Sequence, residues 1–167
     1  MKLRQAIYMG IDRQQLVDLA LSDAGQPLTT LVPAGEPGYK QYDPYPYNPE
    51  KGKQLLADAG YPNGQGLDLT YTYRQRDAEK RVAEQIQAQL KQNLGLDIKI
   101  EGVEWTNMLA ARQAHEYTMF YGSWGHDYPD PQNWLFALFH SSQIQGVGTG
   151  SGNDPGYSDP NFDKLVE

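Results

Sequence analysis

The sequence contains no cysteine. This excludes disulfide bonds, thiol catalysis and zinc–thiolate sites, but it does not decide the cellular compartment, because cysteine-free chains occur on both sides of a membrane. The three histidines, His115, His126 and His140, show neither the helical i, i+4 spacing nor the shared strand face of a metal-ligand set. We therefore expect no metal and no other cofactor.

Long apolar runs and an excess of positive charge are also missing. No stretch approaches the roughly 20 apolar residues that cross a bilayer, and residues 1–4 lack the features of a secretory signal. Lys and Arg number 14 against 21 Asp and Glu, a net charge of −7 without a basic stripe. We expect neither membrane insertion of this chain nor a nucleic-acid partner. The negative balance modestly favours cationic ligands, although it also keeps many domains soluble.

The order of helices and strands predicts one α/β domain, in which helices flank a mixed sheet. A chain of 167 residues is long enough for one domain with a buried core. The first 20 or so residues read as helices, with Asp12 as an N-cap. The strands are expected at residues 67–73, 96–101 and 117–123, and further helices at 49–59, 77–94, 106–114, 134–139 and from 160 onward.

Two of these helices have clear boundary signals. Asn48 is expected to cap the first, with Pro49 at its first position and Gly60 just past its end. Asp77 is expected to cap the second, and Gly95 to end it. With the strands before and after it, the second helix predicts a β-α-β unit.

Six prolines and four tyrosines are concentrated in residues 25–49. This composition predicts an extended segment that its aromatic rings attach to the protein surface, since a long loop stays ordered only if its rings find apolar partners. The alternative is a ligand platform. Trp105 and Trp134 occupy helix positions, where core packing is the commoner role.

Residues 121–131, YGSWGHDYPDP, are the most informative stretch of the sequence. Here a strand delivers Trp124, Asp127 and Tyr128 onto a loop that two prolines stiffen. A carboxylate between aromatic rings lies in a reduced dielectric and attracts an ammonium group strongly. Asp127 is therefore the candidate for holding a peptide α-amine, while Asp130, which precedes a proline, is expected to shape the loop. The alternative for Asp127 is a structural role in a turn before Pro129.

Other chemistries receive less support from the residue pattern. Ser123, His126 and Asp127 are the residue types of a hydrolase, but they lie within five consecutive positions and cannot readily form a relay. The glycine-rich residues 146–152 follow no clear strand and open no helix, so we interpret them as a loop and not as a phosphate site. A domain that recognises protein partners through residues 25–49 is a further alternative.

Five segments besides this loop occur in the order found in one known family. They are residues 4–13 (RQAIYMGIDR), 47–62 (YNPEKGKQLLADAGYP), 83–90 (AEQIQAQL), 96–105 (LDIKIEGVEW) and 157–165 (YSDPNFDKL). Together they resemble the second lobe of the solute-binding proteins of peptide-type ABC transporters, the oligopeptide, dipeptide and nickel binding family. Measured against that family, the first lobe and the closing part of the second are missing, so we expect a segment of a longer protein.

The resemblance implies a function and a location. It implies a non-enzymatic protein with one lobe of a type II periplasmic-binding-protein fold, which closes on a peptide together with its other lobe and delivers the peptide to a membrane permease. Asp127 then matches the acidic residue that holds the amino terminus of the peptide, Trp124 and Tyr128 line the pocket, and Gly122 and Ser123 bond the peptide main chain. The implied location is periplasmic or extracytoplasmic, with a lipid anchor in a Gram-positive parent. Nickel complexes, haem and oligosaccharides are alternative ligands.

Overall fold

The computed structural model describes residues 1–22, 25–125, 127–144 and 152–167. The chain divides into two compact units. The first comprises Met1–Pro27, Asp43–Val103 and Thr118–Tyr121, and the second comprises Leu28–Tyr42, Glu104–Tyr117 and Gly122–Glu167. That all 167 residues act as one domain stays a prediction.

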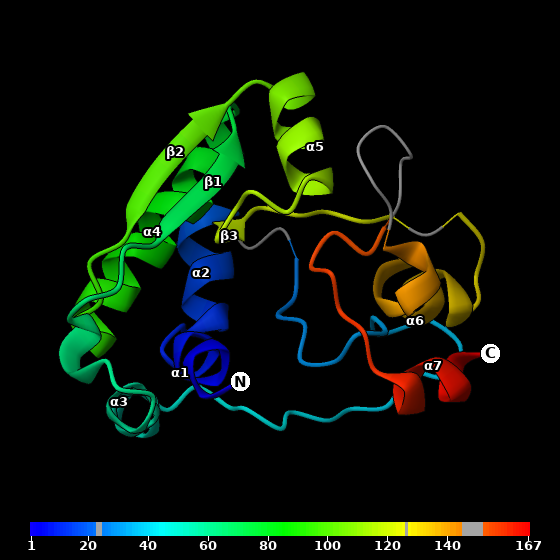
Figure 1. Ribbon diagram of the computed structural model, residues 1–167, viewed down its shortest axis with the longest axis horizontal. Helices are drawn as coiled ribbons and strands as arrows, with labels where there is room; N and C mark the ends of the chain where they lie inside the picture. Colours follow the sequence, from blue (N-terminus) through cyan, green and yellow to red (C-terminus); the bar gives the residue numbers. More distant parts are fainter. Residues whose placement is uncertain (23–24, 126, 145–151) are drawn as a thin grey trace. The chain divides into compact units, whose positions relative to one another are not determined.

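A three-stranded sheet forms the centre of the first unit. β1 (Thr70–Arg74) lies between β2 (Lys99–Val103) and β3 (Met119–Phe120), and both neighbours run parallel to it. α4 (Asp77–Leu94) connects β1 to β2 and covers one face of these two strands (Figure 1). The predicted α/β architecture and the β-α-β unit are confirmed. The sheet was expected to be mixed, but the described strands are all parallel, because each follows its neighbour through a long crossover connection.

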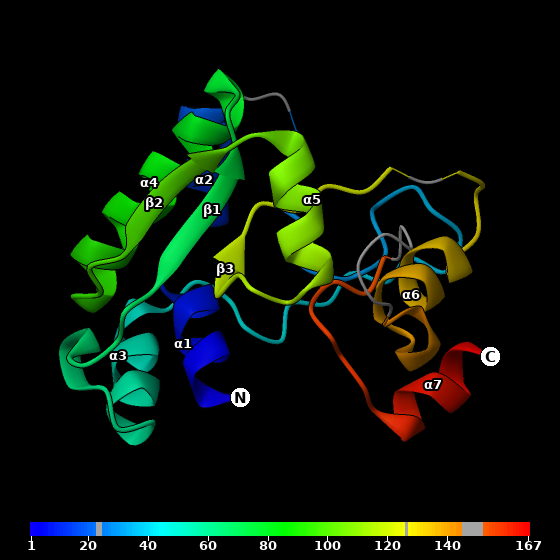
Figure 2. The same ribbon diagram turned by 45° about the horizontal axis from the view of Figure 1, so that its top comes forward.

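The described part of the first unit also contains α1 (Lys2–Met9), α2 (Arg13–Ala20) and α3 (Pro49–Asp58). α1 and α3 lie side by side in Figure 2. Gly52 makes this approach possible, since a Cβ at that position would lie 2.8 Å from Leu94 Cδ2 and 3.1 Å from the Ala6 carbonyl oxygen. The core between the helices and the sheet contains buried aliphatic and aromatic side chains, among them Ala6, Leu56, Tyr71, Tyr73, Val82, Ile86, Leu90, Leu94 and Ile98. Burial raises the pKa of the Tyr71 phenol, and the nearby Tyr121 and Glu79 add to the shift.

Most of the predicted helix boundaries are confirmed. Oδ1 of Asn48 accepts the Lys51 N–H at 3.0 Å, and Oδ1 of Asp12 accepts the Gln15 N–H at 3.0 Å, so both residues cap their helices. Gly95 ends α4 with φ 70°, a left-handed conformation that favours glycine. The prediction for Asp77 is wrong in one respect. Asp77 is the first residue of α4 and makes no capping bond, although its negative charge suits the first turn of a helix.

The last strand is shorter than predicted. A strand was expected over residues 117–123, but β3 pairs with β1 only at Met119 and Phe120, and one further backbone bond runs from Tyr121 N–H to the Thr72 carbonyl oxygen at 2.8 Å. β1 itself continues to Arg74, so β3 ends where its own backbone leaves the sheet, which an apolar run does not show.

The tyrosines of the proline-rich segment are less buried than predicted. Tyr45 packs edge-on against Tyr8, with ring centroids 6.3 Å apart, and its hydroxyl accepts a bond from Gln5 Nε2 at 2.9 Å. The rings of Tyr39, Tyr42, Tyr45 and Tyr47 are nevertheless 39, 62, 37 and 43% exposed. The four rings therefore do not form a buried layer.

In the second unit, the described residues form α5 (Trp105–Gln113), α6 (Gln132–Phe139) and α7 (Pro160–Val166). Short 3₁₀ turns occur at η2 (Ser141–Gln143) here and at η1 (Pro62–Gly64) in the first unit. Phe139, Tyr157 and Phe162 form an edge-to-face cluster with centroid distances of 5.4 to 6.4 Å, which packs α7 against the end of α6. The fully buried Asn153 donates to the carbonyl oxygens of His140 and Tyr157.

The two tryptophans expected in the core differ from each other. Trp134 is partly buried, whereas the Trp105 ring is 45% exposed and faces the Arg112 guanidinium at 5.9 Å. The prediction that Trp105 packs in the core is therefore wrong. Arg112 also forms an ion pair with the buried Asp154. None of the described helices has the length and apolar character to cross a membrane.

We predict that Leu90→Ala lowers the free energy of unfolding by about 2–5 kcal/mol, because Leu90 is fully buried in the core of the first unit and a shorter side chain leaves a cavity. Leu165→Ala, at a position 84% exposed, is the control and should change stability by less than about 0.5 kcal/mol. Chemical denaturation measures both values. A cost at Leu90 as small as that at Leu165 would contradict this core.

Asp163 links α7 to the end of α6. Its Oδ1 accepts the Ser141 N–H at 3.0 Å, and its Oδ2 accepts the Ser141 hydroxyl at 2.6 Å. Nε2 of the buried His140 lies 4.0 Å from Asp163 Oδ1 and 3.5 Å from Glu167 Oε1. The two bonds from Ser141, and to a lesser degree His140, lower the pKa of the Asp163 carboxyl below its ordinary value of 3.8.

A carboxyl whose pKa is lower in the folded state stabilises the fold above its unfolded pKa, and this contribution is lost as the pH falls through the folded pKa. We therefore predict that wild type loses more stability than Asp163→Asn when the pH is lowered from 6 to below about 3.8. Denaturation at a series of pH values measures this difference, with Asp97→Asn, at a side chain 71% exposed, as the control. Equal acid sensitivity in wild type and Asp163→Asn would contradict the assignment.

Candidate functional site

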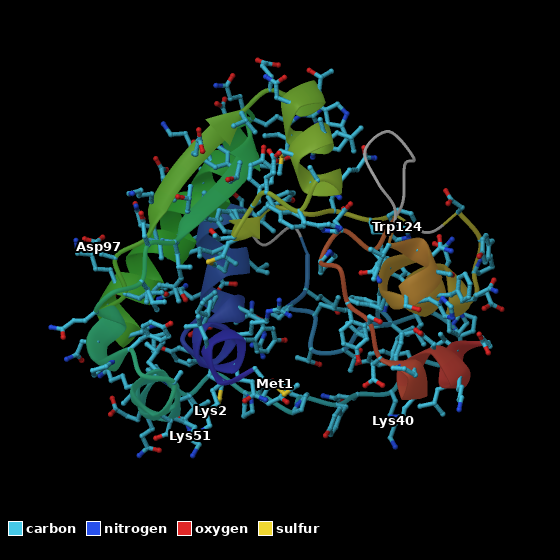
Figure 3. The ribbon with its side chains drawn as sticks, in the orientation of Figure 1. Met1, Lys2, Lys40, Lys51, Asp97 and Trp124 are labelled. Atoms are coloured by element: carbon cyan, nitrogen blue, oxygen red, sulfur yellow. The ribbon has the colours of Figure 1, made fainter. Side chains whose placement is uncertain are left out.

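The loop predicted to bind ligand follows β3 directly and belongs to the second unit. Its candidate residues Gly122, Ser123, Trp124, Asp127 and Tyr128 are all exposed, with Trp124 at 38% and Tyr128 at 44%. Figure 3 labels Trp124 beside α6. His126 lies outside the described residues, as do residues 145–151, which include most of the glycine-rich stretch.

The loop is anchored by Asn133, which the sequence reasoning did not identify. Asn133 is only 2% exposed, and its side-chain oxygen Oδ1 accepts the Trp124 indole Nε1–H at 3.0 Å and the Asp127 backbone N–H at 3.3 Å. One buried oxygen therefore holds both the aromatic ring and the backbone of the candidate acidic residue. The signal in the sequence was a pair of amides, Gln132 and Asn133, in the first turn of an otherwise apolar helix, QNWLFALF.

Asp130 has the loop-shaping position that was predicted for it. Its Oδ1 accepts the Gln132 N–H at 2.8 Å, and its carbonyl oxygen accepts the Asn133 N–H at 3.0 Å. These bonds satisfy amides at the start of α6, as a capping residue does. The hydroxyl of Tyr128 donates to Gln132 Oε1 at 3.1 Å, which ties the far side of the loop to the same helix.

The environment of Asp127 differs from the prediction. Its side chain is exposed, so the aromatic residues of this chain do not surround it with a low dielectric, and that part of the prediction is wrong. Within the described residues, the Asp127 carboxylate accepts no hydrogen bond and forms no ion pair. Among the described residues, no contact supports the structural alternative, in which this carboxylate stabilises a turn.

The backbone before Trp124 leaves the sheet. Pairing with β1 ends at Tyr121, and Gly122 and Ser123, both exposed residues, continue outside the strand. A Cβ at Gly125 would have no atom within 4 Å, so the loop is open at this point. An extended ligand could approach this segment through main-chain hydrogen bonds.

The described residues give little support to the other chemistries. No group of three His, Cys, Asp or Glu side chains among them is placed to hold a metal ion. Ser123 and Asp127 are both exposed, and no hydrogen bond between them is found in this part of the chain. The third member of the hydrolase alternative, His126, lies outside the described residues.

Comparison with known proteins decides the family. The profile described as "Bacterial extracellular solute-binding proteins, family 5 Middle" matches residues 1–146. The chain belongs to this family. Heme-binding protein A of Haemophilus influenzae is 32% identical over 169 residues, which cover 99% of this chain and 30% of that protein. The periplasmic murein peptide-binding protein MppA of Escherichia coli is 27% identical over 172 residues, again 99% of this chain and 30% of the relative.

A solved structure gives the same result for the fold. DppA of Helicobacter pylori, a periplasmic binding protein associated with an ABC transporter and solved in complex with the peptide STSA, superimposes with a TM-score of 0.88 at 29% identity. The match covers 99% of this chain and 31% of that structure. The chain thus spans about 30% of the length of the relatives it matches, and the fold is that of a segment of family 5 binding proteins.

We predict that Asp130 and Asp127 contribute differently to stability. Asp130→Ala removes the acceptor at the start of α6 and should lower the free energy of unfolding by about 0.5–2 kcal/mol. Asp127→Ala removes an exposed carboxylate without a partner among the described residues and should change it by less than about 0.5 kcal/mol. Thermal and chemical denaturation of the two variants measure the difference. A larger loss from Asp127→Ala would show that Asp127 has a structural role.

Proposed function

We propose that this chain is part of the solute-binding component of an ABC importer, which binds peptides and delivers them to a membrane permease. The observation that carries the proposal is the exposed Asp127 carboxylate, which lacks a partner among the described residues and lies in a loop fixed by Asn133. Family membership and the peptide-bound neighbour support it. The family also supports a periplasmic or extracytoplasmic location and a binding role without catalysis.

The chemistry of the loop suits the amino end of a peptide. Asp127 supplies a negative charge for the α-ammonium, and the backbone of the exposed residues Gly122 and Ser123 supplies donors and acceptors for the peptide main chain. Trp124 and Tyr128 present exposed rings on either side of Asp127 in the sequence, which can exclude water once a ligand is bound.

The strength of peptide binding depends on how far the protein encloses the ammonium group. An exposed ion pair contributes about 0–1 kcal/mol, whereas an ammonium enclosed by protein loses about 2–5 kcal/mol of binding when its counter-ion is removed. We propose that a second lobe in the longer protein closes over the ligand and supplies this enclosure. The closed state is favoured only by the extra affinity that the ligand has for it. This chain alone is then expected to bind peptides weakly.

The experiment is a nuclear magnetic resonance titration of the isotope-labelled chain, which detects weak binding. The probes are the tetrapeptide Ser-Thr-Ser-Ala and its N-acetylated form. We predict that wild type prefers the free amine, and that Asp127→Asn weakens binding of the free-amine peptide up to about fivefold without affecting the acetylated one. Asp130→Asn, which keeps a side-chain oxygen for the Gln132 N–H, is the matched control.

Equal losses for both peptides, or a larger loss from Asp130→Asn, would contradict the assignment of the amine to Asp127. In a longer protein that encloses the ligand, the loss caused by Asp127→Asn should rise to about 2–5 kcal/mol, because both charges are then desolvated.

Haem is the second candidate ligand, because one relative is named a heme-binding protein at 32% identity. Titration with haem, followed by its visible absorption, separates the two candidates. Saturable haem binding that Asp127→Asn leaves unchanged would favour haem over a peptide.

A further inference from the structure

The candidate binding loop depends on a residue that does not face solvent. Gly122, Ser123, Trp124, Asp127 and Tyr128 are exposed, so close packing does not fix their positions. Asn133 is 2% exposed and makes side-chain contacts to two of these five residues. It is therefore the buried point to which this exposed loop is attached.

The two contacts use the same atom. An amide oxygen has two lone pairs, and Oδ1 of Asn133 accepts one bond from the Trp124 indole at 3.0 Å and one from the Asp127 N–H at 3.3 Å. The indole bond constrains the plane of the Trp124 ring. The backbone bond constrains the point from which the Asp127 side chain projects. A change at this one oxygen must alter both.

Asn133 is itself held in place. It lies in the first turn of α6, and its backbone N–H donates to the Asp130 carbonyl oxygen at 3.0 Å. The oxygen thus projects from a helix whose start is also organised by the Asp130 side chain. Groups held by regular structure are better positioned for binding than groups held by a loop alone.

We propose that Asn133 is a positioning residue, which orients the Trp124 ring and the Asp127 backbone through one buried oxygen and thereby sets the affinity of the loop for an ammonium group. This inference rests on the proposed function. Its physical basis is preorganisation, since a loop that is already ordered loses less conformational entropy when ligand binds.

The test that needs no ligand uses the tryptophan indole N–H signals of the isotope-labelled chain. Asn133→Ala removes the acceptor and should move the Trp124 signal and speed its exchange with solvent. Asn133→Asp keeps an oxygen at the same place and should restore a slowly exchanging signal. Asn107→Ala, at an exposed position of α5, is the control and should leave the Trp124 signal unchanged.

The unmodified chain provides a second measurement in case Asn133→Ala does not fold. Its Trp124 indole N–H should exchange more slowly than that of tryptophan in an unstructured peptide, because it is bonded to a buried oxygen. Exchange at the unstructured rate, or a Trp124 signal that is identical in wild type and Asn133→Ala, would overturn the positioning role.

Affinity is then measured with the free-amine tetrapeptide Ser-Thr-Ser-Ala. Asn133→Ala should weaken binding by up to about fivefold, the limit set by removing the Asp127 charge, because a loop that is not already ordered loses more conformational entropy on binding. If wild type binds through Asp127 but Asn133→Ala binds equally well, the inference is wrong and the proposed function stands. If wild type shows no preference for the free amine, the proposed function fails, and with it the claim about affinity.

Discussion

The candidate site depends on one buried hydrogen-bond acceptor, Oδ1 of Asn133, which holds the Trp124 indole and the Asp127 backbone together. Without it, the loop after β3 would consist of exposed residues joined to α6 mainly through Asp130 and Tyr128. Because a buried amide oxygen that loses its donors is costly, the contact also favours the ordered loop over alternatives. The Asp127 carboxylate is thereby presented to solvent from a defined place, which is what recognition of a small cation requires.

Much of the first unit could be predicted because its signals are local. Asn48 and Asp12 cap their helices with their own side chains, and Gly95 takes a backbone conformation that few other residues tolerate. The length of β3 and the exposure of the tyrosines in the proline-rich segment were not predictable, because they depend on contacts with residues that are distant in the sequence. Gly52 illustrates the same limit. Glycine is unfavourable inside a helix, and the reason for it here, the close approach of Ala6 and Leu94, is known only from the structure.

The position of the loop that carries the candidate residues was predictable, but the residue that holds this loop in place was not. The succession of strand, Trp124, Asp127 and two prolines located the loop, and the proline after Asp130 indicated its shaping role. Asn133 was missed because two polar residues, Gln132 and Asn133, begin this apolar helix, and the sequence does not show which of them is buried. The low dielectric expected around Asp127 is absent because neighbours in sequence need not enclose a side chain. The family relatives are about three times longer than this chain. We propose that a lobe formed by such additional residues encloses the ligand.

The most direct test of the account asks which end of a bound peptide meets the loop. Intermolecular nuclear Overhauser effects between Ser-Thr-Ser-Ala and this chain answer it, since they report only protons within a few ångströms of each other. The account predicts effects from the first residue of the peptide to the Trp124 indole ring and the Asp127 amide proton. Effects that connect these groups only to the last residue of the peptide, or that connect the first residue to a different part of the chain, would contradict it.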